Sequence, residues 1–339
     1  MPKNGPAARR RNTASVAFLP QFPLARNRVP TECAPMILFS VGLPGRFAAW
    51  CDAAVARLAG EAAIIGAETP DEVAAALIRS AEPNLVVAAR CPTPALRTLL
   101  IDAEAPIFVA VDDPRQSLFH LVAEGHDFRA ATRVIANSGV AAAVCASLPK
   151  ACLLRPGETP DMFPPDMPPY APPDIESWWE ALDPAIRTVA DGALRESGEI
   201  TWDRSLLWLV ADPARHAGSA IEIGDPGPLV AGPEIGLPPG NWAASVTLAV
   251  SREAVGAGFA IEIRGPEPLA SAQATPDARG LCAATLVFPV APAGQTISFS
   301  IASTAPVPGG RLALGNVVLV PSHGANSVIP SELTAVLDL

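Results

Sequence analysis

The sequence predicts an α/β fold with a parallel sheet, followed by an all-β antiparallel sandwich. Two observations support this. From Met36 to about Arg155, apolar runs alternate with helical patterns. Strands that are apolar on both faces imply a parallel sheet covered on both sides. From about Leu206 the runs become short and partly alternating, and Gly, Pro and Asp interrupt them at spacings typical of an antiparallel sandwich.

The first part alternates strands and helices in order along the chain. The runs ILFSVGL, AAII, NLVVAA and PIFVAV are the expected strands, and we expect helices over 46–59, from Thr69, near 94–103 and from Pro114. Thr69 is a good N-cap, because Pro70 suits the first turn and Glu72 is placed to close a capping box. A long helix over 127–148 then leads to a last strand, ACLLR. In such a sheet the ligand site lies at the carboxyl ends of the strands.

A proline-rich segment follows the sheet. Residues 155–174 contain eight prolines in 20 residues, a density that excludes helix and central strand. It predicts either an extended linker or a strap that lies over the first domain. The next stretch, IESWWEALDPAIRTVADGALRES, predicts one or two helices. Trp178 and Trp179 on it have the helical spacing of core residues, and we expect them to dock on a neighbouring element.

Seven short runs predict the sandwich strands: LLWLVAD, SAIEIG, ASVTLAV, FAIEIRG, AATLVFPV, TISFSIAS and RLALGNVVLV. GPEIGLPPGNWAASVTLAV is interpreted as a proline and glycine turn that feeds a strand. The expected organisation is a basic extension at 1–35, an α/β domain at 36–155, a strap with helices at 156–204, a β-sandwich at 205–321 and a loose or docked tail at 322–339.

Charge excludes some classes of partner. Residues 1–35 carry a net charge of +5, and the rest of the 339-residue chain carries −15. An acidic body is a poor partner for nucleic acid, because each phosphate contact needs a cation.

No apolar run reaches the roughly 18 residues of a membrane span. The basic head lacks the apolar core of a secretory signal, so we interpret it as a disordered extension, with a targeting segment or an early start codon as alternatives.

Cysteines and histidines give no metal site. The six cysteines are scattered without a CxxC pair, and most lie inside apolar segments, as expected of buried thiols in a reducing compartment. We therefore expect a cytoplasmic protein. The four histidines are equally dispersed, which leaves no visible set of metal ligands.

The stretch MILFSVGLPGRFAAW places a Gly-Leu-Pro-Gly turn between a strand and a helix, where a phosphate loop would lie. At this point the chain resembles the sulfotransferases, P-loop-like proteins whose sulfate donor is 3'-phosphoadenosine-5'-phosphosulfate. Pro44 and Trp50 match the family's loop. The loop's basic, hydroxyl and glycine positions hold other residues, and only Arg46, shifted by one, could supply a cation.

A second stretch, FVAVDDPRQSLFHL, resembles the family's 3'-phosphate site. Asp113-Pro114-Arg115 fits the pattern, but Asp112 replaces the leading arginine and His120 replaces the serine, with Ser117 one turn earlier. An aspartate repels the phosphate that such a site should hold. The resemblance covers about a third of the chain and indicates the remains of a phosphate site, with a plain tight turn after the first strand as the alternative. The donor-binding residues that it implies are Gly42, Pro44, Gly45, Arg46, Arg115 and Ser117.

Three functions stay open from the sequence. The first is a diverged, non-catalytic sulfotransferase-like protein in polysaccharide or glycoconjugate metabolism, whose sandwich resembles carbohydrate-binding jelly rolls and offers Trp242 and Trp208 for sugar stacking. The second is an active sulfo- or glycosyltransferase with another donor, such as a nucleotide sugar. Asp112 and Asp113 would then hold a metal, and His120 or His126 would be the base, although Asp before Pro also predicts a helix N-cap. The third is an adaptor with a protein partner.

Overall fold

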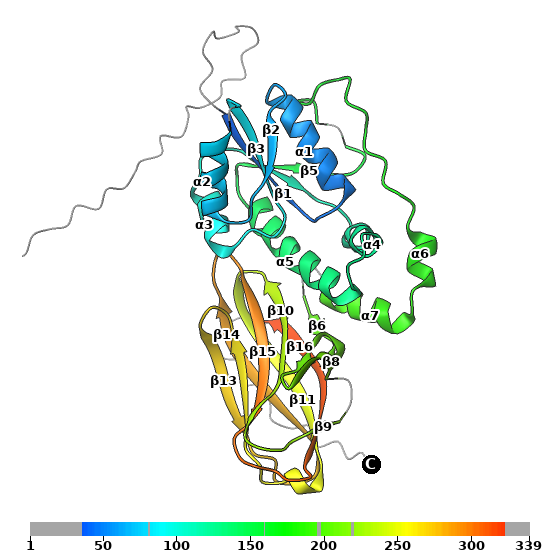
Figure 1. Ribbon diagram of the computed structural model, residues 1–339, viewed down its shortest axis with the longest axis vertical. Coiled ribbons are helices and arrows are strands. Elements are labelled where there is room, and N and C mark those ends of the chain that lie inside the picture. Colours follow the sequence, from blue (N-terminus) through cyan, green and yellow to red (C-terminus); the bar gives the residue numbers. More distant parts are fainter. Residues whose placement is uncertain (1–35, 81, 159, 195–197, 218–219, 323–339) are drawn as a thin grey trace, which may run out of the picture.

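The computed structural model describes residues 36–80, 82–158, 160–194, 198–217 and 220–322. The expected basic extension and all of the expected tail except Ser322 lie outside them. Figure 1 shows an α/β part and a part built of antiparallel sheets, stacked along the long axis of the molecule. The predicted two-part layout is therefore confirmed. None of the described helices is long and apolar enough to cross a membrane.

The first part contains a five-stranded parallel sheet in the order β2-β3-β1-β4-β5. In chain order its elements are β1 (Met36–Gly42), α1 (Arg46–Leu58), β2 (Ala63–Gly66), α2 (Pro70–Arg79), β3 (Asn84–Ala89), α3 (Pro94–Asp102), β4 (Ile107–Ala110), α4 (Pro114–Ala123), α5 (Phe128–Ala146) and β5 (Ala151–Leu154). Strand β1 is central and pairs in parallel with both β3 and β4. The chain order reverses around β1, and this is the point at which open α/β sheets bind ligands.

The helix starts agree with the sequence. Thr69 accepts a hydrogen bond from the Glu72 N–H, and the Glu72 carboxylate accepts one from the Thr69 N–H, which completes the predicted capping box of α2. Asp113 and Asp127 cap α4 and α5 in the same way, each accepting from a backbone N–H two residues on. These caps satisfy amide donors that a helix leaves unpaired at its start.

The two faces of the parallel sheet are covered differently. Helices α2, α3 and α5 cover one face. On the other face α1 packs with the segment between β5 and the helices α6 (Glu176–Ala181) and α7 (Pro184–Ala193). Phe163 and Met167 of this segment are buried in the same cluster as Phe108 of β4. The described part of 155–174 contains no helix or strand, and we call it the strap.

Two antiparallel sheets enclose the largest hydrophobic cluster. One has the order β13-β12-β15-β10-β7-β8, and the other β14-β11-β16-β6 with β9 beside β16. The bounds are β6 (Ile200–Trp202), β7 (Trp208–Leu209), β8 (Asp212–His216), β9 (Ile221–Glu222), β10 (Gly227–Leu237), β11 (Gly240–Val250), β12 (Phe259–Arg264), β13 (Pro268–Ala274), β14 (Gly280–Val290), β15 (Gln295–Ser303) and β16 (Arg311–Pro321), with single 3-10 turns at Arg204–Leu206 and Arg252–Ala254.

One expectation about this region was wrong. GPEIGL is not part of a turn but the second half of β10, which pairs with β15 on both sides of the Gly232-Pro233 step. Only Pro238 and Pro239 separate β10 from β11. The irregular pairing between Gly232 and Ile235 lets the strand contain a proline, which has no N–H to donate to a regular ladder.

Helix α5 joins the two parts. Asn137 accepts a hydrogen bond from the Gly236 N–H and donates one to the Glu234 carbonyl, at 3.3 Å. On α3, the buried Arg97 donates to the carbonyl of Gly294, at 2.9 Å, in the turn between β14 and β15. Arg133 of α5 lies over the Trp208 ring, 5.7 Å from its centroid. These contacts hold the sandwich against the α5 side of the sheet.

We expect Gly294→Ala to destabilise the protein by about 2 to 3 kcal/mol, because two penalties combine. Gly294 has a φ of 66°, and a Cβ there would lie 2.7 Å from Cγ1 of Val140 on α5. Gly309→Ala is the matched control, since its φ is 72° but a Cβ would meet no atom within 4 Å. The control should lose only about 1 kcal/mol in urea unfolding, and equal losses would show that the α5 contact is loose.

Candidate functional site

The carboxyl ends of β1 and β4 bring several predicted residues together. Arg46, Asp112 and His120 line a small pocket there. Its other described walls are Tyr170 and Pro173 of the strap and Gln116, Phe119 and Ala123 of α4. The cavity measures about 30 Å³, on the order of one water molecule. The pocket therefore has the place of a phosphate site but not the size of a nucleotide site.

At the turn after β1, the backbones of β1 and β4 approach each other closely. A Cβ on Gly42 would lie 2.7 Å from Cβ of Ala110, so glycine lets β1 and β4 meet at their carboxyl ends. Pro44 and Gly45 follow, and Gly45 precedes α1 without a side-chain cap. Arg46 begins the helix with an exposed side chain, and it makes no ion pair with any other described residue. It is the one predicted donor-site cation that borders the pocket.

Asp112 is the acidic group of this pocket. Its Oδ1 accepts a hydrogen bond from the Asp113 N–H at 2.9 Å. Burial raises the pKa of Asp112 to about 6, the Asp113 N–H opposes this rise, and the Asp113 charge adds to it. A carboxyl group in this environment opposes the binding of phosphate, as the sequence predicted.

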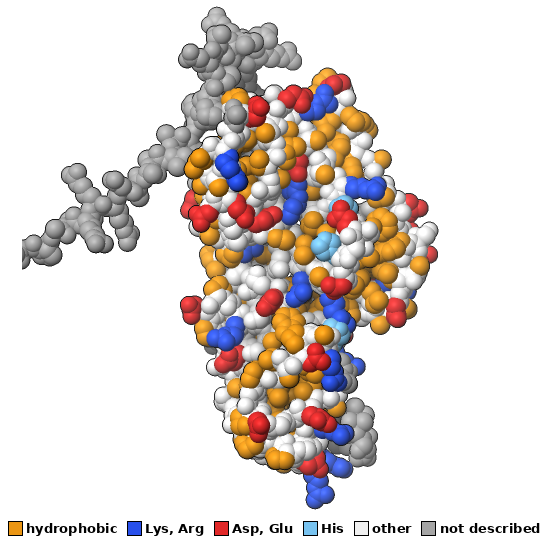
Figure 2. Space-filling view, in the orientation of Figure 1, with side chains coloured by type: hydrophobic (Ala, Val, Ile, Leu, Met, Phe, Trp, Pro, Cys, Tyr) orange, Lys and Arg blue, Asp and Glu red, His pale blue; other side chains and the backbone are white. Residues whose placement is uncertain are grey.

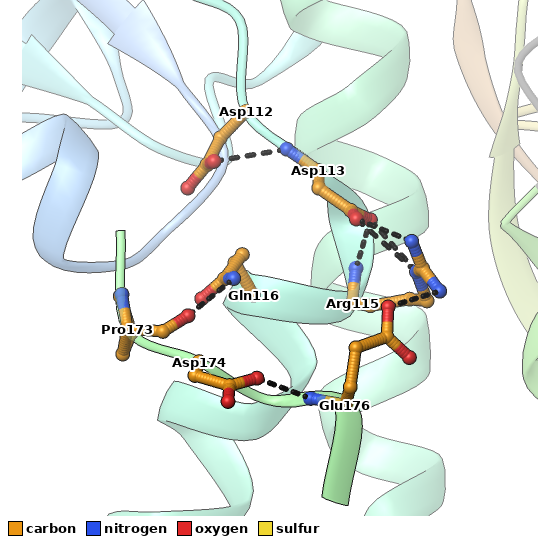
Figure 3. Close-up of polar contacts among 7 residues, drawn as sticks. All are labelled: Asp112, Asp113, Arg115, Gln116, Pro173, Asp174 and Glu176. Carbon is orange, nitrogen blue, oxygen red and sulfur yellow. Dashed lines mark hydrogen bonds and ion pairs between the residues drawn. The ribbon is translucent and has the colours of Figure 1, made fainter. Parts of the chain in front are cut away.

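Asp113 and Arg115 form an ion pair with each other (Figure 3). Asp113 accepts from the Arg115 backbone N–H at 2.9 Å and from its Nε and Nη2 at 3.1 and 2.9 Å. Arg115 also lies 3.7 Å from Glu176 and 5.6 Å from the Trp179 ring centroid. Figure 3 shows the Asp112 and Asp113 carboxylates pointing apart. Asp113 is therefore a helix cap, and the pair does not converge on a metal position.

The remaining predicted residues, Ser117, His120 and His126, do not all lie at the pocket. His120 is half-buried, and its Nε2 lies 3.4 Å from Oε1 of Glu124. Ser117 is fully buried, and its hydroxyl has no hydrogen-bond partner among the described residues. His126 is exposed after α4 and is not among the described residues that line the pocket. No three His, Cys, Asp or Glu side chains of the described residues are grouped to hold a metal.

The strap covers this site through several contacts. The Tyr170 ring packs 5.0 Å from the Phe47 ring and 6.3 Å from the Trp50 ring, measured between centroids. Gln116 donates to the Pro173 carbonyl at 2.9 Å, and the Trp50 indole donates to that of Pro168 at 3.0 Å. The sequence predicted an extended strap but not its path. Its single tyrosine, among eight prolines, was the available signal.

A polar network that the sequence analysis missed lies beside this site. The Ser40 hydroxyl of β1 donates to Asp52 of α1 at 2.6 Å, and Arg90, directly after β3, pairs with the other Asp52 oxygen. Glu68 accepts from the Arg90 and Cys91 backbone N–H groups at 2.9 and 2.8 Å. The network ties the carboxyl ends of β1, β2 and β3 together. Burial is the main cause of the raised pKa of Glu68.

The two tryptophans predicted to bind sugar do not form a binding platform. Trp242 is 4% exposed, and its indole donates to the Pro238 carbonyl at 3.0 Å. It is a core residue, because Trp242 alternates with the outward residues of β11 and faces the interior of the sandwich. Trp208 is half-buried beneath Arg133 and against Gly232, where a Cβ would lie 2.5 Å from the ring. Stacking on Trp242 was therefore a wrong prediction.

A larger cavity of about 320 Å³ lies between β4, α5 and the sandwich. Its described walls are almost entirely apolar and include Leu43, Val109, Ile135 and Val140. Asp112 is the one ionisable residue among them, and none of them is a cation. A phosphate or sulfate group would find no partner charge in these walls.

Comparison with known proteins identifies no family. No family model and no curated protein matches the chain. Solved structures with some likeness include the Clostridium thermocellum N-terminal endo-1,4-beta-D-xylanase 10B modules complexed with xylohexaose, at 10% identity and a TM-score of 0.18 over 24% of this chain and 16% of that chain. Another is the C-terminal domain of EclA, a sugar-binding protein, at 12% identity and a TM-score of 0.22 over 29% of this chain and 77% of that chain. Both likenesses are too slight to support an inference.

Proposed function

We propose that this chain is a diverged, non-catalytic sulfotransferase-like protein with an appended jelly-roll-like sandwich. Its role in polysaccharide or glycoconjugate metabolism is binding and not catalysis. The observation that supports the loss of catalysis is the strap, which lies over the carboxyl ends of β1 and β4 and leaves a pocket of about 30 Å³ beside Arg46. The cavity of about 320 Å³ on the α5 side of the same strand ends has no cation in its described walls to hold a donor phosphate. The sulfotransferase resemblance rests on the two segments that contain Pro44 and Asp113-Pro114-Arg115. The link to glycans rests on the resemblance of the sandwich's strand pattern to carbohydrate-binding jelly rolls, and the slight structural likenesses add nothing to it.

The charges at the site agree with this proposal. Arg115 is held by Asp113 and Glu176, so Arg46 is the remaining cation that a donor phosphate would meet. Asp112 lies in the same pocket as Arg46 and opposes an anion. One exposed arginine beside a buried carboxyl group is a weak counterpart for the several negative charges of 3'-phosphoadenosine-5'-phosphosulfate.

An active transferase with another donor has less support. The two aspartates point apart, and Asp113 is saturated by Arg115. His120 has Glu124 beside it, and the pocket leaves no room for both a base and a substrate. A metal-assisted mechanism would need both carboxylates to converge on one ion.

Calorimetric titration with adenosine 3',5'-bisphosphate, the product form of the sulfate donor, tests the proposal. We expect no binding heat at about 1 mM ligand, for the native chain and for Arg46→Ala alike. Binding at micromolar ligand that disappears in Arg46→Ala, and persists in the exposed control Arg79→Ala, would overturn the proposal.

Tyr170→Ala provides a second arm of this titration, because it removes the ring that packs on Phe47 and Trp50. If the donor site is degenerate, opening the strap should not create binding. Micromolar binding by Tyr170→Ala would mean that a competent donor site lies beneath the strap, and it would refute the loss of donor binding.

A further inference from the structure

The outer faces of the two antiparallel sheets differ in chemistry. On the β13-β12-β15 sheet, the outward side chains include Glu262, Arg264 and several serines. On the β14-β11-β16 sheet, the inward residues belong to the core, so the alternate residues face outward. From Asn241 to Ala249, from Leu281 to Pro289 and from Ala313 to Val320, none of the outward side chains is charged.

We call these outward positions of β14, β11 and β16 the uncharged face. Val287 of β14 is 56% exposed and Leu281 is 48% exposed. The register places Val287 beside Ala243 and Val320, and Leu281 beside Ala249 and Ala313. The rows between them carry Ala, Thr, Ser and Val. The face is uncharged and largely apolar, and its side chains are exposed or half-buried apart from Ala243, which is 3% exposed. Exposed apolar patches on soluble proteins mark interaction sites.

Strand β14 is the edge of its sheet, and β13 of the other sheet lies in contact with it. The outward side chains of β14 carry no charge. Strand edges and faces that remain exposed are usually protected by charged residues, especially lysine, or by proline within the strand. Outward-facing β14 side chains have a single proline, Pro289, at the end of the strand and no lysine. Leu281 and Val287 are instead the largest side chains of the uncharged face on this strand. Residues of this kind are expected where another protein surface covers them.

We propose that the uncharged face binds a second copy of this chain, sheet to sheet, in a two-fold symmetric dimer. A two-fold interface places the same patch on both subunits, so the patch must be complementary to itself. A face without charges meets this condition, because no like charges come together. The opposite outer face would bury Glu262 and Arg264, a partly exposed ion pair at 3.8 Å, and would remove both charges from water.

The area of the face is sufficient for a weak dimer. Three strands about 4.8 Å apart and five rows about 6.8 Å apart cover roughly 500 Å² per subunit, or roughly 1,000 Å² in total. This is at the lower limit for a specific interface, so we expect dimerisation on the order of micromolar concentration. The association does not involve the strap or Arg46, and its failure would leave the proposed function intact.

Sedimentation velocity of the full chain from about 1 to 300 μM tests the dimer. We expect a monomer that converts to a dimer with rising concentration. Val287→Lys should weaken this association at least about tenfold, because the ammonium group would be buried in an apolar interface. Ser271→Lys, on edge strand β13 of the opposite sheet and beside Glu262, is the matched control and should associate like the native chain.

Two outcomes would overturn the proposal. One is a monomer over the whole concentration range, and the other is a dimer that Val287→Lys leaves unchanged. Circular dichroism establishes that each variant is folded. Leu281→Lys, at the other end of the same strand, replaces Val287→Lys if the latter does not fold.

Discussion

Asp52→Ala is expected to lower the free energy of unfolding by about 3 kcal/mol, since it leaves a mostly buried arginine without its partner. Asp52 is 7% exposed and accepts hydrogen bonds from Ser40 and Arg90. The Arg90 side chain is 20% exposed, which lets water compensate part of the lost pairing. Urea unfolding measures the change.

Two further variants separate pairing from simple loss of a side chain. The double variant Asp52→Leu with Arg90→Met removes both charges, and we expect it to be more stable than Asp52→Ala, because no buried charge is left unpaired. Glu262→Ala, which breaks a more exposed ion pair with Arg264 at 3.8 Å, should change stability by less than about 0.5 kcal/mol. A loss in Asp52→Ala no larger than in Glu262→Ala would contradict the buried network.

Asp112→Asn is expected to stabilise the protein at neutral pH and to have little effect near pH 4. The folded state raises the pKa of Asp112 from 3.8 to about 6, chiefly by burial. Between these values the folded chain binds more protons than the unfolded chain, so the contribution of Asp112 to stability falls as pH rises. The shift corresponds to at most about 3 kcal/mol, and we expect about 1 to 2 because the carboxyl group keeps some solvent contact.

Urea unfolding at pH 4 and pH 7.5 tests this expectation, and the change should be nearly complete at about pH 6. Asparagine keeps the acceptor for the Asp113 N–H, so the local turn should survive. Asp166→Asn is a control of opposite sign, because Arg57 lowers the pKa of Asp166 and its carboxylate is stabilising when ionised. An Asp112→Asn effect that is equal at both pH values would show that the carboxyl group is not buried in solution.

Local signals predicted much of the α/β part. The caps at Thr69 and Asp113 and the strands that are apolar on both faces are each encoded within a few residues. The sequence also offered Asp113 as a helix cap, the alternative to a metal ligand, and its hydrogen bonds agree with the cap. The failure at GPEIGL has a local cause too, since glycine and proline usually mark turns, and only the partner strand β15 makes this segment a strand.

The polar network, the path of the strap and the position of Trp242 depend on contacts between residues that are far apart in the sequence. Ser40, Asp52 and Arg90 are separated by 12 to 50 positions, and nothing in their own segments pairs them. The path of the strap depends on the packing of Phe163 and Tyr170 against α1 and the part of the sheet face that α1 does not cover. Trp242 was a candidate for sugar stacking because a lone tryptophan on a strand does not show which face it occupies. The neighbours in the core decide this.

The central claim, that the strap occupies the former donor site, can be tested on one side chain. Tyr170 is the only tyrosine of the chain, so incorporation of 3-fluorotyrosine gives a single fluorine resonance. We expect a resonance distinct from that of the urea-denatured chain, because the ring packs on Phe47 and Trp50, and we expect no change on addition of adenosine 3',5'-bisphosphate. A resonance at the denatured position, or one that the bisphosphate displaces, would contradict the account.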